Sequence, residues 1–342
     1  MATPNTTHYG EGRIVIGDRL AARGRNVLIA DILDGLRETP KRISSMFFYD
    51  ARGSQLFEEI TALPEYYLTR IEKRLLKEYA RVCAGQWSDV DIVELGSGDY
   101  TKISLILDSV RPERMGSIRY IPVDVSEFAI RQSAERLTRT YQGLAFHGLV
   151  ADFLTQLECI PCNRPRLFCL LGSTIGNFSV AQRQAFIADL ARAMMPGDEF
   201  LLGVDLVKPV EVLEKAYNDS QGVTAEFNRN ILRVVNGLAE TDFRPDWFAH
   251  VAYYSHEHAR IEMHLRAERD MEVATPLGRN EKVYLRKNET IHTEDSHKFT
   301  IRQAMELLES VGLKVISCLQ DPEQWFGLFQ ACKPPRGRYV GC

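Results

Sequence analysis

The chain has 342 residues, of which 45% are hydrophobic, 26% charged and 9% aromatic. These proportions exclude a disordered, collagen-like or coiled-coil protein, and 42 basic against 46 acidic residues give a net charge of -4, without the basic excess of a nucleic-acid binder. No apolar run approaches the ~18 residues of a membrane span. Residues 1–12 are polar and lack the apolar core of a signal peptide, so we expect residues 1–26 to form a flexible tail of a cytoplasmic protein.

Strand-like and helix-like segments alternate through the middle of the chain. Residues 27–70 are mostly helical in pattern. Further along, apolar runs predict strands at 91–95, 118–123, 145–150, 167–171 and 199–204, and helical patterns lie between them at 101–110, 127–141 and 182–195. Because this alternation is typical of a parallel sheet with crossover helices, we interpret residues 71–216 as an α/β core.

The pattern changes after residue 216. A helix at 226–235 and strands at 249–254, 260–267 and 281–285 predict an inserted α+β lobe over 217–290. We expect residues 27–70 to join it as a second lobe, with a cleft at the carboxyl ends of the core strands. Residues 291–333 contain a helix at 301–311 and strands at 313–318 and 327–331, and we interpret them as a return to the core; 334–342 is an expected tail.

The seven cysteines are odd in number and scattered, unlike the disulfide framework of a small secreted protein. The one local pair, Cys159 and Cys162, has no second pair to complete a zinc ribbon. We therefore expect no metal site.

A glycine-containing turn follows the first core strand. Gly96 and Gly98 allow a ligand to approach the backbone, but Thr101 stands where a dinucleotide fingerprint has its third glycine, which argues against an NAD-type site. Asp124 ends the next strand, where a carboxylate can accept hydrogen bonds from ribose hydroxyls.

The third core strand is followed by an acid and an aromatic residue, Asp152 and Phe153. The acid can bind an adenine amino group and the ring can stack on the base. Glu94 and Asp99 add negative charge near the glycine turn. Such surroundings suit a ligand that has a sulfonium cation and no phosphate, so the sequence favours S-adenosylmethionine.

Seven further blocks of sequence add to this interpretation. They are FFYDARGSQLF at 47–57, LPEYYLTR at 63–70, LGSTIGN at 171–177, GVDLVK at 203–208, AYND at 216–219, FNRN at 227–230 and RIEM at 260–263. Over residues 27–333 the chain resembles the histidine-specific, S-adenosylmethionine-dependent Nα-methyltransferases. That family includes the ergothioneine-pathway enzyme that makes histidine trimethylbetaine, and fungal relatives that methylate tryptophan derivatives.

The resemblance implies an α/β fold with a Rossmann-like class I methyltransferase core and a second α+β lobe that binds substrate. It implies that S-adenosylmethionine is bound by Gly96, Lys102, Asp124, Asp152 and Phe153. It also implies that the amino acid is bound by Tyr66, Asn177, Tyr217, Glu294 and Ser296, with Tyr49, Gly172 and Met263 lining the same pocket. In the family, the counterparts of Asn177 and Tyr217 hold the substrate carboxylate, and those of Tyr66, Glu294 and Ser296 contact the imidazole.

The residue types agree with these roles. The Asn177 amide can donate to a carboxylate without offering a competing nucleophile. The Glu294 carboxylate can accept an imidazole N–H and so favour histidine over an isosteric aromatic ring. Without the resemblance, Asn177 reads as a turn residue, Glu294 as a solvated acid, and Tyr66 and Tyr217 as core aromatics.

Three positions depart from the family pattern. Leu68 replaces the proline that usually follows the Tyr-Tyr pair, and Tyr100 is bulkier than the polar residues common there. Asp295 adds a charge where an apolar residue is often found, between Glu294 and Ser296. We expect this charge to alter substrate preference or the number of methyl groups added.

The sequence thus predicts a monomeric enzyme that methylates the α-amino group of free L-histidine, up to the trimethylbetaine hercynine. The amine takes the methyl group directly, and Tyr49 is our candidate to carry the proton away. One alternative is another aromatic or modified amino acid as substrate, such as a tryptophan derivative. A second is a scaffold protein that binds S-adenosylmethionine or S-adenosylhomocysteine without catalysis.

Overall fold

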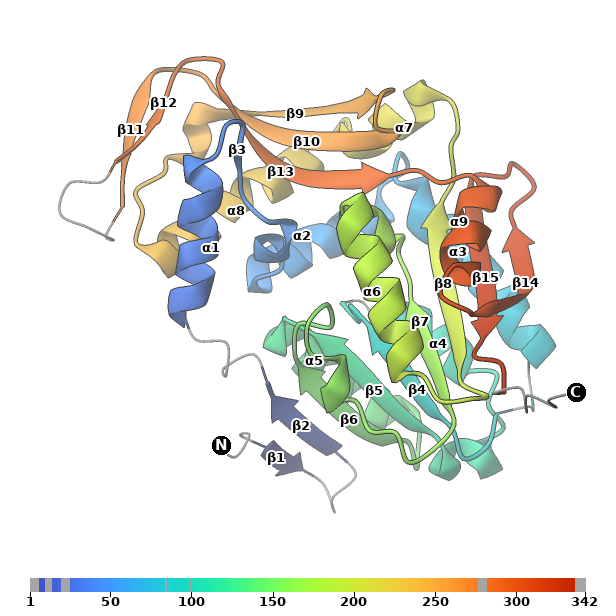
Figure 1. Cartoon of the computed structure of the whole chain (residues 1–342). Helices are drawn as coiled ribbons and strands as arrows, with labels where there is room; N and C mark the ends of the chain where they lie inside the picture. The colour runs from blue at the N-terminus through green and yellow to red at the C-terminus, as the bar shows by residue number, and fades with distance from the viewer. Residues whose placement is uncertain are drawn as a thin grey trace, which may run out of the picture. The chain divides into compact units, whose positions relative to one another are not determined.

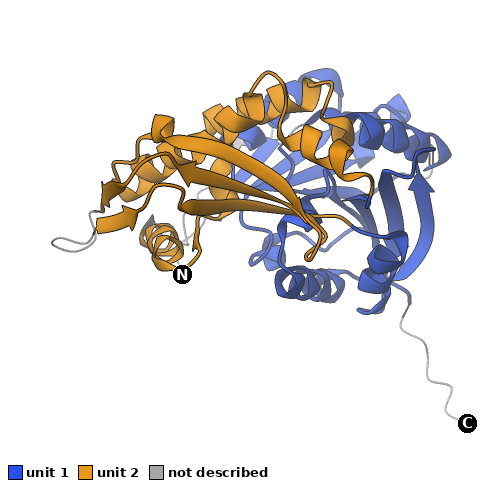
Figure 2. Ribbon diagram, turned by 90° about the horizontal axis from the view of Figure 1, so that it is seen from above, with its two compact units in different colours: residues 1–19, 70–207, 299–342 blue, residues 20–69, 208–298 orange. Residues whose placement is uncertain are grey.

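The computed structural model describes residues 6–9, 14–19, 25–83, 85, 87–98, 100–275 and 282–335. The chain divides into two compact units, which Figure 2 shows in blue and orange. Unit 1 comprises Met1–Arg19, Arg70–Val207 and Phe299–Cys342, and unit 2 comprises Leu20–Thr69 and Lys208–Lys298. Each unit is therefore built from segments that are distant in sequence.

A nine-stranded sheet forms the centre of unit 1, in the order β1-β2-β6-β5-β4-β7-β8-β15-β14 (Figure 1). Its strands are β1 (Thr6–Tyr9), β2 (Ile14–Asp18), β4 (Asp91–Leu95), β5 (Arg119–Asp124), β6 (Ala145–Val150), β7 (Arg166–Leu170), β8 (Glu199–Asp205), β14 (Lys314–Gln320) and β15 (Phe326–Cys332). Strands β2, β6, β5, β4, β7 and β8 run parallel, whereas β1, β15 and β14 join in antiparallel pairs. The chain moves outward from β4 in both directions, which makes the β4–β7 boundary the topological switch point where such sheets bind ligands.

Helices cover the two faces of this sheet. They are α3 (Tyr67–Cys83, which starts in unit 2), α4 (Tyr100–Leu107), α5 (Glu127–Thr140), α6 (Val180–Ala193) and α9 (Ile301–Glu309). Phe186 of α6 and Leu308 of α9 join one apolar core with inward residues of the sheet such as Leu149. Ile130 of α5 instead contacts Gly148, the neighbour of Leu149 on β6. Because adjacent strand residues point to opposite faces, α5 lies on the other side, and the predicted α/β core is confirmed.

Unit 2 contains a four-stranded sheet in the order β3-β13-β10-β9. Its strands are β3 (Lys41–Arg42), β9 (Phe248–Ser255), β10 (Arg260–Ala267) and β13 (Thr290–His297), and β11 (Met271–Ala274) pairs with β12 (Lys282–Leu285) beside it. The helices are α1 (Arg25–Arg37), α2 (Ala51–Ala62), α7 (Val210–Tyr217) and α8 (Val223–Ala239). Buried Phe227, Ile231 and Val235 recur at helical spacing along α8, which gives this helix its apolar face.

The N-terminal segment differs from the flexible tail that the sequence predicts. Strand β2 pairs in parallel with β6, and Ile16 is buried. The short run Ile-Val-Ile gives β2 enough apolar surface to extend the sheet, and β1 then pairs with its outer edge. The remaining parts of the predicted tails, 1–5, 10–13, 20–24 and 336–342, lie outside the described residues.

The predicted return to the core at residue 291 is also wrong. Residues 291–297 belong to β13, between β3 and β10 of unit 2, and unit 1 resumes at Phe299. The polar sequence of β13 hides its strand character; its Asp295 pairs with Arg260 on the neighbouring strand β10. The sequence also places α7 in the core, whereas it belongs to unit 2. Among the described helices, none is both long and apolar enough to cross a membrane.

Candidate functional site

The turn after β4 has the geometry of a ligand cradle. Gly96 has φ +71°, a left-handed conformation that favours glycine, and its N–H donates to Val123 O at 2.8 Å. A Cβ on Gly96 would lie 3.5 Å from the ring of Phe153. The hydroxyl of Ser97 is buried and has no hydrogen-bond partner among the described residues. This turn therefore combines an open backbone, an aromatic ring and an unsatisfied polar atom.

Asp124 ends β5 beside that turn. Its Oδ2 accepts from Gly98 N at 3.1 Å and its Oδ1 from Ser126 N at 2.8 Å. Burial raises the pKa of Asp124, against the backbone N–H groups of Ser126 and Gly98, which lower it. The structure thus holds a buried carboxylate next to the glycine turn; Asp99, the other acid expected near it, lies outside the described residues.

Asp152 and Phe153 follow β6 at the same end of the sheet. Asp152 caps its own turn, since Oδ1 accepts from Leu154 N at 3.0 Å and Oδ2 from Thr155 Oγ1 at 3.3 Å. The Phe153 ring packs edge-on against Phe186, with centroids 5.7 Å apart. The apolar core therefore fixes the ring beside Gly96.

Glu94 lies within the sheet. It is 2% exposed, and Tyr120 Oη donates to its Oε2 at 2.5 Å. Burial and the negative charge of Glu94 raise the pKa of Tyr120 well above its ordinary value. This acid, which the sequence places around the ligand, is thus bonded to a neighbouring strand.

A buried acid that sequence reasoning missed connects two predicted site residues. Glu72 of α3 is fully buried, and its Oε2 pairs with Lys102 Nζ of α4 at 2.8 Å. Its Oε1 accepts from Gly172 N at 2.6 Å. A helical glutamate gives no sequence signal for this role, except that it follows the block 63–70 by two residues.

The turn after β7 carries Gly172 and Asn177. Gly172 and Ser173 both have left-handed φ values, +75° and +59°, and Asp205 N donates to Ser173 Oγ at 2.9 Å. A short 3-10 helix, Thr174–Asn177, follows and leaves Asn177 partly exposed. Hydrogen bonds to Asp205 of β8 and Glu72 of α3 therefore hold the turn, with Asn177 at the carboxyl end of the parallel strands.

In unit 2, an aromatic cluster holds the first two predicted tyrosines. Tyr49 and Tyr66 both pack edge-on against Phe57, at centroid distances of 5.9 and 6.3 Å. Asp50, next to Tyr49, caps α2 through Gly53 N and also accepts from Asn230 Nδ2 of α8 at 2.8 Å. The last residue of the FNRN block therefore anchors the segment that carries Tyr49.

Met263 and Glu294 are directly opposite each other on β10 and β13. Met263 is buried and Glu294 partly buried. A β-bulge follows Met263, and Asn228 of α8 secures it: Asn228 Nδ2 donates to His264 O at 3.0 Å, and Thr293 Oγ1 donates to Asn228 Oδ1 at 2.7 Å. The second residue of the FNRN block thus positions the strands around Glu294, a role the sequence did not reveal.

Asp295 points away from Glu294, because neighbouring residues of a strand face opposite sides. Its Oδ2 accepts from Arg260 Nη1 at 2.8 Å, and its Oδ1 lies 2.9 Å from His292 Nε2. Burial opposes the ionisation of Glu262 on the same face, but Arg260 and Tyr253 outweigh it and lower the pKa of Glu262 to about 2. Asp295 therefore does not share the face of Glu294 and Ser296, and its charge is paired with Arg260 on the other face; its effect on substrate preference stays a prediction.

Tyr217, Ser296 and Lys298 form a buried polar cluster. Tyr217 Oη donates to Ser296 Oγ at 2.7 Å, and Lys298 Nζ donates to both, at 2.7 Å to Ser296 Oγ and 3.2 Å to Tyr217 Oη. Each residue is less than 8% exposed. Sequence reasoning missed Lys298, although its position two residues after Ser296 predicts the same side of an extended chain.

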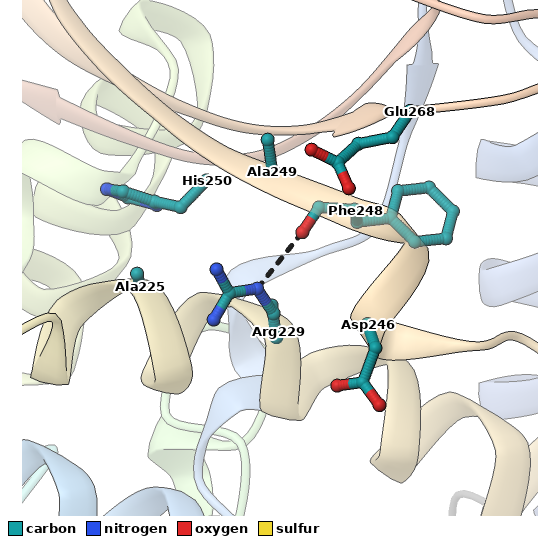
Figure 3. A pocket seen from close by; sticks show the side chains of 7 residues that line it. All are labelled: Ala225, Arg229, Asp246, Phe248, Ala249, His250 and Glu268. Carbon is teal, nitrogen blue, oxygen red and sulfur yellow. Dashed lines mark hydrogen bonds between the residues drawn. The ribbon is translucent and has the colours of Figure 1, made fainter.

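A separate hollow of about 480 Å³ lies in unit 2 and is shown in Figure 3. Its lining residues are Ala225, Arg229, Asp246, Phe248, Ala249, His250 and Glu268. The Arg229 guanidinium donates from Nε to Phe248 O at 3.0 Å (dashed in Figure 3). Burial lowers the pKa of His250, whose ring contacts Tyr217 O at 2.8 Å. None of the predicted site residues lines this hollow.

The structure groups the predicted residues by unit. Unit 1 contains Gly96, Lys102, Asp124, Asp152, Phe153, Gly172 and Asn177. Unit 2 contains Tyr49, Tyr66, Tyr217, Met263, Glu294 and Ser296. Within unit 1 all but Lys102 lie at or after the carboxyl ends of parallel strands, and Glu72 connects Lys102 to Gly172 among them.

Comparison with known proteins identifies the family. Residues 28–333 match the family described as histidine-specific methyltransferase, SAM-dependent. The chain belongs to this family. The resemblance inferred from the sequence blocks is thereby confirmed, and S-adenosylmethionine is the methyl donor of the family.

Individual relatives agree. The chain is 40% identical to the histidine N-alpha-methyltransferase of Mycobacterium tuberculosis over 311 residues, covering 91% of this chain and 96% of that protein. It is 32% identical to ergothioneine biosynthesis protein 1 of Neurospora crassa, covering 82% of this chain and 32% of that longer protein. It is 28% identical to a 4-dimethylallyltryptophan N-methyltransferase of Aspergillus fumigatus, covering 83% of this chain and 87% of that protein.

Proposed function

We propose that this enzyme methylates the α-amino group of free L-histidine, up to the trimethylbetaine hercynine. The observation that carries the proposal is the face of β13 that presents Glu294 and Ser296 two residues apart, with Met263 opposite Glu294. A carboxylate and a hydroxyl at this spacing suit the two nitrogens of an imidazole. The 40% identity to a histidine N-alpha-methyltransferase supports the same substrate.

For the donor, the proposed binding residues are Gly96, Lys102, Asp124, Asp152 and Phe153. The open backbone at Gly96, the ring of Phe153 and the unsatisfied hydroxyl of Ser97 fit an adenosyl group, and Asp124 fits its ribose hydroxyls. When bound, S-adenosylmethionine supplies a methyl group to the amine and leaves as S-adenosylhomocysteine.

The proposed residues for the amino acid hold it by its two ends. Asn177 and Tyr217 donate to the carboxylate, and Tyr66, Glu294 and Ser296 contact the imidazole. Gly172 of unit 1 and Tyr49 and Met263 of unit 2 are further proposed contacts of the amino acid. Holding both ends fixes the amine, and such orientation is the main contribution that the protein makes to a direct transfer.

Each transfer forms one N–C bond and breaks one C–S bond, and before it the α-ammonium group of the substrate loses one proton. Because the attacking amine must be neutral, that proton has to leave the site. The Tyr49 hydroxyl, in the aromatic cluster with Phe57, is our candidate to pass it to water.

The test is to incubate the protein with S-adenosylmethionine and each free amino acid, and to weigh the products. We expect mass gains of one to three methyl groups on histidine alone, and loss of the gain in the Asn177→Ala variant. A gain on tryptophan instead would favour the substrate class named for the Aspergillus fumigatus relative.

A protein that binds S-adenosylhomocysteine in calorimetry but modifies no amino acid would be the scaffold of the alternative hypothesis. The absence of both binding and mass gain would reject the proposed function entirely.

A further inference from the structure

A buried lysine lies against two of the hydroxyl groups that we assign to histidine. Lys298 is 3% exposed, and its Nζ is 2.7 Å from Ser296 Oγ and 3.2 Å from Tyr217 Oη. The ammonium also lies 5.0 Å from the centre of the Tyr217 ring. Its main chain is fixed as well, since Lys298 N donates to Ala259 O at 2.8 Å.

The hydrogen bonds between Lys298 and the two hydroxyl groups can run in one direction only. An ammonium group has three N–H donors and no acceptor, whereas a hydroxyl has one O–H donor and two lone pairs. Both Tyr217 Oη and Ser296 Oγ must therefore accept from Lys298. Each hydroxyl keeps its own hydrogen, which it can direct at a third group; between ligands, Tyr217 directs its hydrogen at Ser296.

Because Lys298 occupies one lone pair of each hydroxyl and leaves its hydrogen available, the arrangement favours a ligand that offers acceptors. Histidine has two, the carboxylate and the unprotonated nitrogen of a neutral imidazole. The other imidazole nitrogen carries a hydrogen, and Glu294, on the same face of β13 as Ser296, is placed to accept it. Glu294 then accepts from one imidazole nitrogen, and Ser296 donates to the other.

We propose that Lys298 is a positioning residue that makes Tyr217 and Ser296 hydrogen-bond donors toward the substrate, and thereby selects an amino acid with a neutral imidazole. This inference rests on the proposed function, because it assigns which groups of the same site donate hydrogen bonds to the substrate. Lys298 itself need not touch the substrate.

The chain offers a matched control in the same unit. Lys208 is also buried, donates to Tyr67 Oη at 2.9 Å and lies 4.5 Å from the centre of that ring. Neither Lys208 nor Tyr67 is among the proposed site residues. The variants Lys298→Met and Lys208→Met each remove one buried ammonium group that donates to a tyrosine hydroxyl. Both lose a buried charge, but only Lys298→Met changes a hydroxyl that we assign to the substrate.

The experiment measures the KM for histidine, kcat, the affinity for S-adenosylhomocysteine and the unfolding temperature. Losing a charge-assisted hydrogen bond predicts a rise of about 10- to 100-fold in the KM of Lys298→Met, with the affinity for S-adenosylhomocysteine within about twofold of wild type. Lys208→Met should lower the unfolding temperature with much less change in this KM. Lys298→Arg, which still only donates, should recover part of the loss.

A KM for histidine in Lys298→Met that equals that of wild type would overturn the inference while leaving the proposed function intact. If Lys298→Met does not fold, Lys298→Arg and Lys298→Gln decide, because a glutamine amide can accept as well as donate. We expect Lys298→Arg to bind histidine more tightly than Lys298→Gln does, and equal binding by the two variants would contradict the inference. A wild-type enzyme that neither binds nor methylates histidine would instead refute the proposed function.

Discussion

At the scale of single residues, the alternation of a strand separates two neighbouring acids. Glu294 is opposite Met263, whereas Asp295 pairs with Arg260 and His292 on the other face. Read as a sequence, the run 292–297 is a polar stretch in which both acids look equivalent. The structure shows that only Glu294 shares a face with Ser296.

This separation predicts different effects for two isosteric changes. Glu294→Gln should raise the KM for histidine by about 10- to 100-fold, because an amide accepts an imidazole N–H more weakly than a carboxylate does. Asp295→Asn, the matched control, should change this KM by less than about threefold, since Arg260 keeps its partner Glu262. Steady-state kinetics on both variants, with calorimetry of S-adenosylhomocysteine, checks the prediction. Equal effects of the two changes would contradict the assignment of Glu294 to the imidazole.

The buried carboxylate of Asp124 predicts that donor affinity depends on pH. Burial raises its pKa, so the group takes up a proton at a higher pH than an exposed aspartate. Below this raised pKa the neutral acid is a poorer acceptor for ribose hydroxyls, so the affinity for S-adenosylhomocysteine should fall as the pH is lowered. Calorimetry over a pH series measures this fall, and Asp124→Asn should bind more weakly at all pH values with a flatter profile. An Asp124→Asn profile as steep as that of wild type would assign the effect to another group.

At the scale of secondary-structure elements, Glu72 joins α3, α4 and the turn after β7. It is fully buried and contacts both Lys102 and Gly172. A Cβ on Gly203 of β8 would clash with Oε1 of Glu72, so this strand needs a glycine where the carboxylate passes. The contacts couple the predicted donor-binding lysine to the turn that leads to Asn177.

Removing one partner of this buried pair should be costly. Glu72→Ala leaves the Lys102 ammonium without its carboxylate and should lower the free energy of unfolding by about 3–5 kcal/mol. The double variant Glu72→Ala with Lys102→Met should lose less than the sum of the single changes. Chemical denaturation of the four proteins gives the coupling free energy, and additive losses would show that the pair is not coupled.

A second buried pair of unit 1 serves as the functional control. Arg166 and Asp198 are both about 2–3% exposed and in contact, but neither is a proposed site residue. Asp198→Ala should destabilise the fold comparably while leaving the KM for S-adenosylmethionine nearly unchanged, whereas Glu72→Ala should raise it.

At the scale of the whole molecule, the sequence predicts the elements whose periodicity is strong. Apolar runs and turn residues predict the parallel strands and their helices. The order of those strands then predicts which acidic residues lie at their carboxyl ends. Strand β2 and strand β13 were missed because their partners are distant in the chain: β2 pairs with β6, and β13 pairs with β3 and β10. Glu72 and Asn228 act through contacts of the same kind, which no local pattern encodes.

The division into two units predicts two separate protection patterns in hydrogen exchange. S-adenosylhomocysteine should slow exchange in peptides that cover 95–98 and 152–155 of unit 1, because these turns would contact it. Histidine should slow exchange in peptides that cover 294–298 of unit 2. The β11–β12 pair, which contains no proposed site residue, is the internal control. Protection by histidine confined to other segments would contradict the substrate residues proposed here.

The discontinuity of the units restricts how the enzyme can be recombined. Segments 25–69 and 208–298 share one sheet through the pairing of β3 with β13, and Asn230 reaches back to Asp50. A chimera that exchanges only one of these segments with a relative would disrupt the pairing of β3 with β13. It would also separate the Asn230 amide from Asp50. Grafting a new specificity therefore requires both pieces to be moved together.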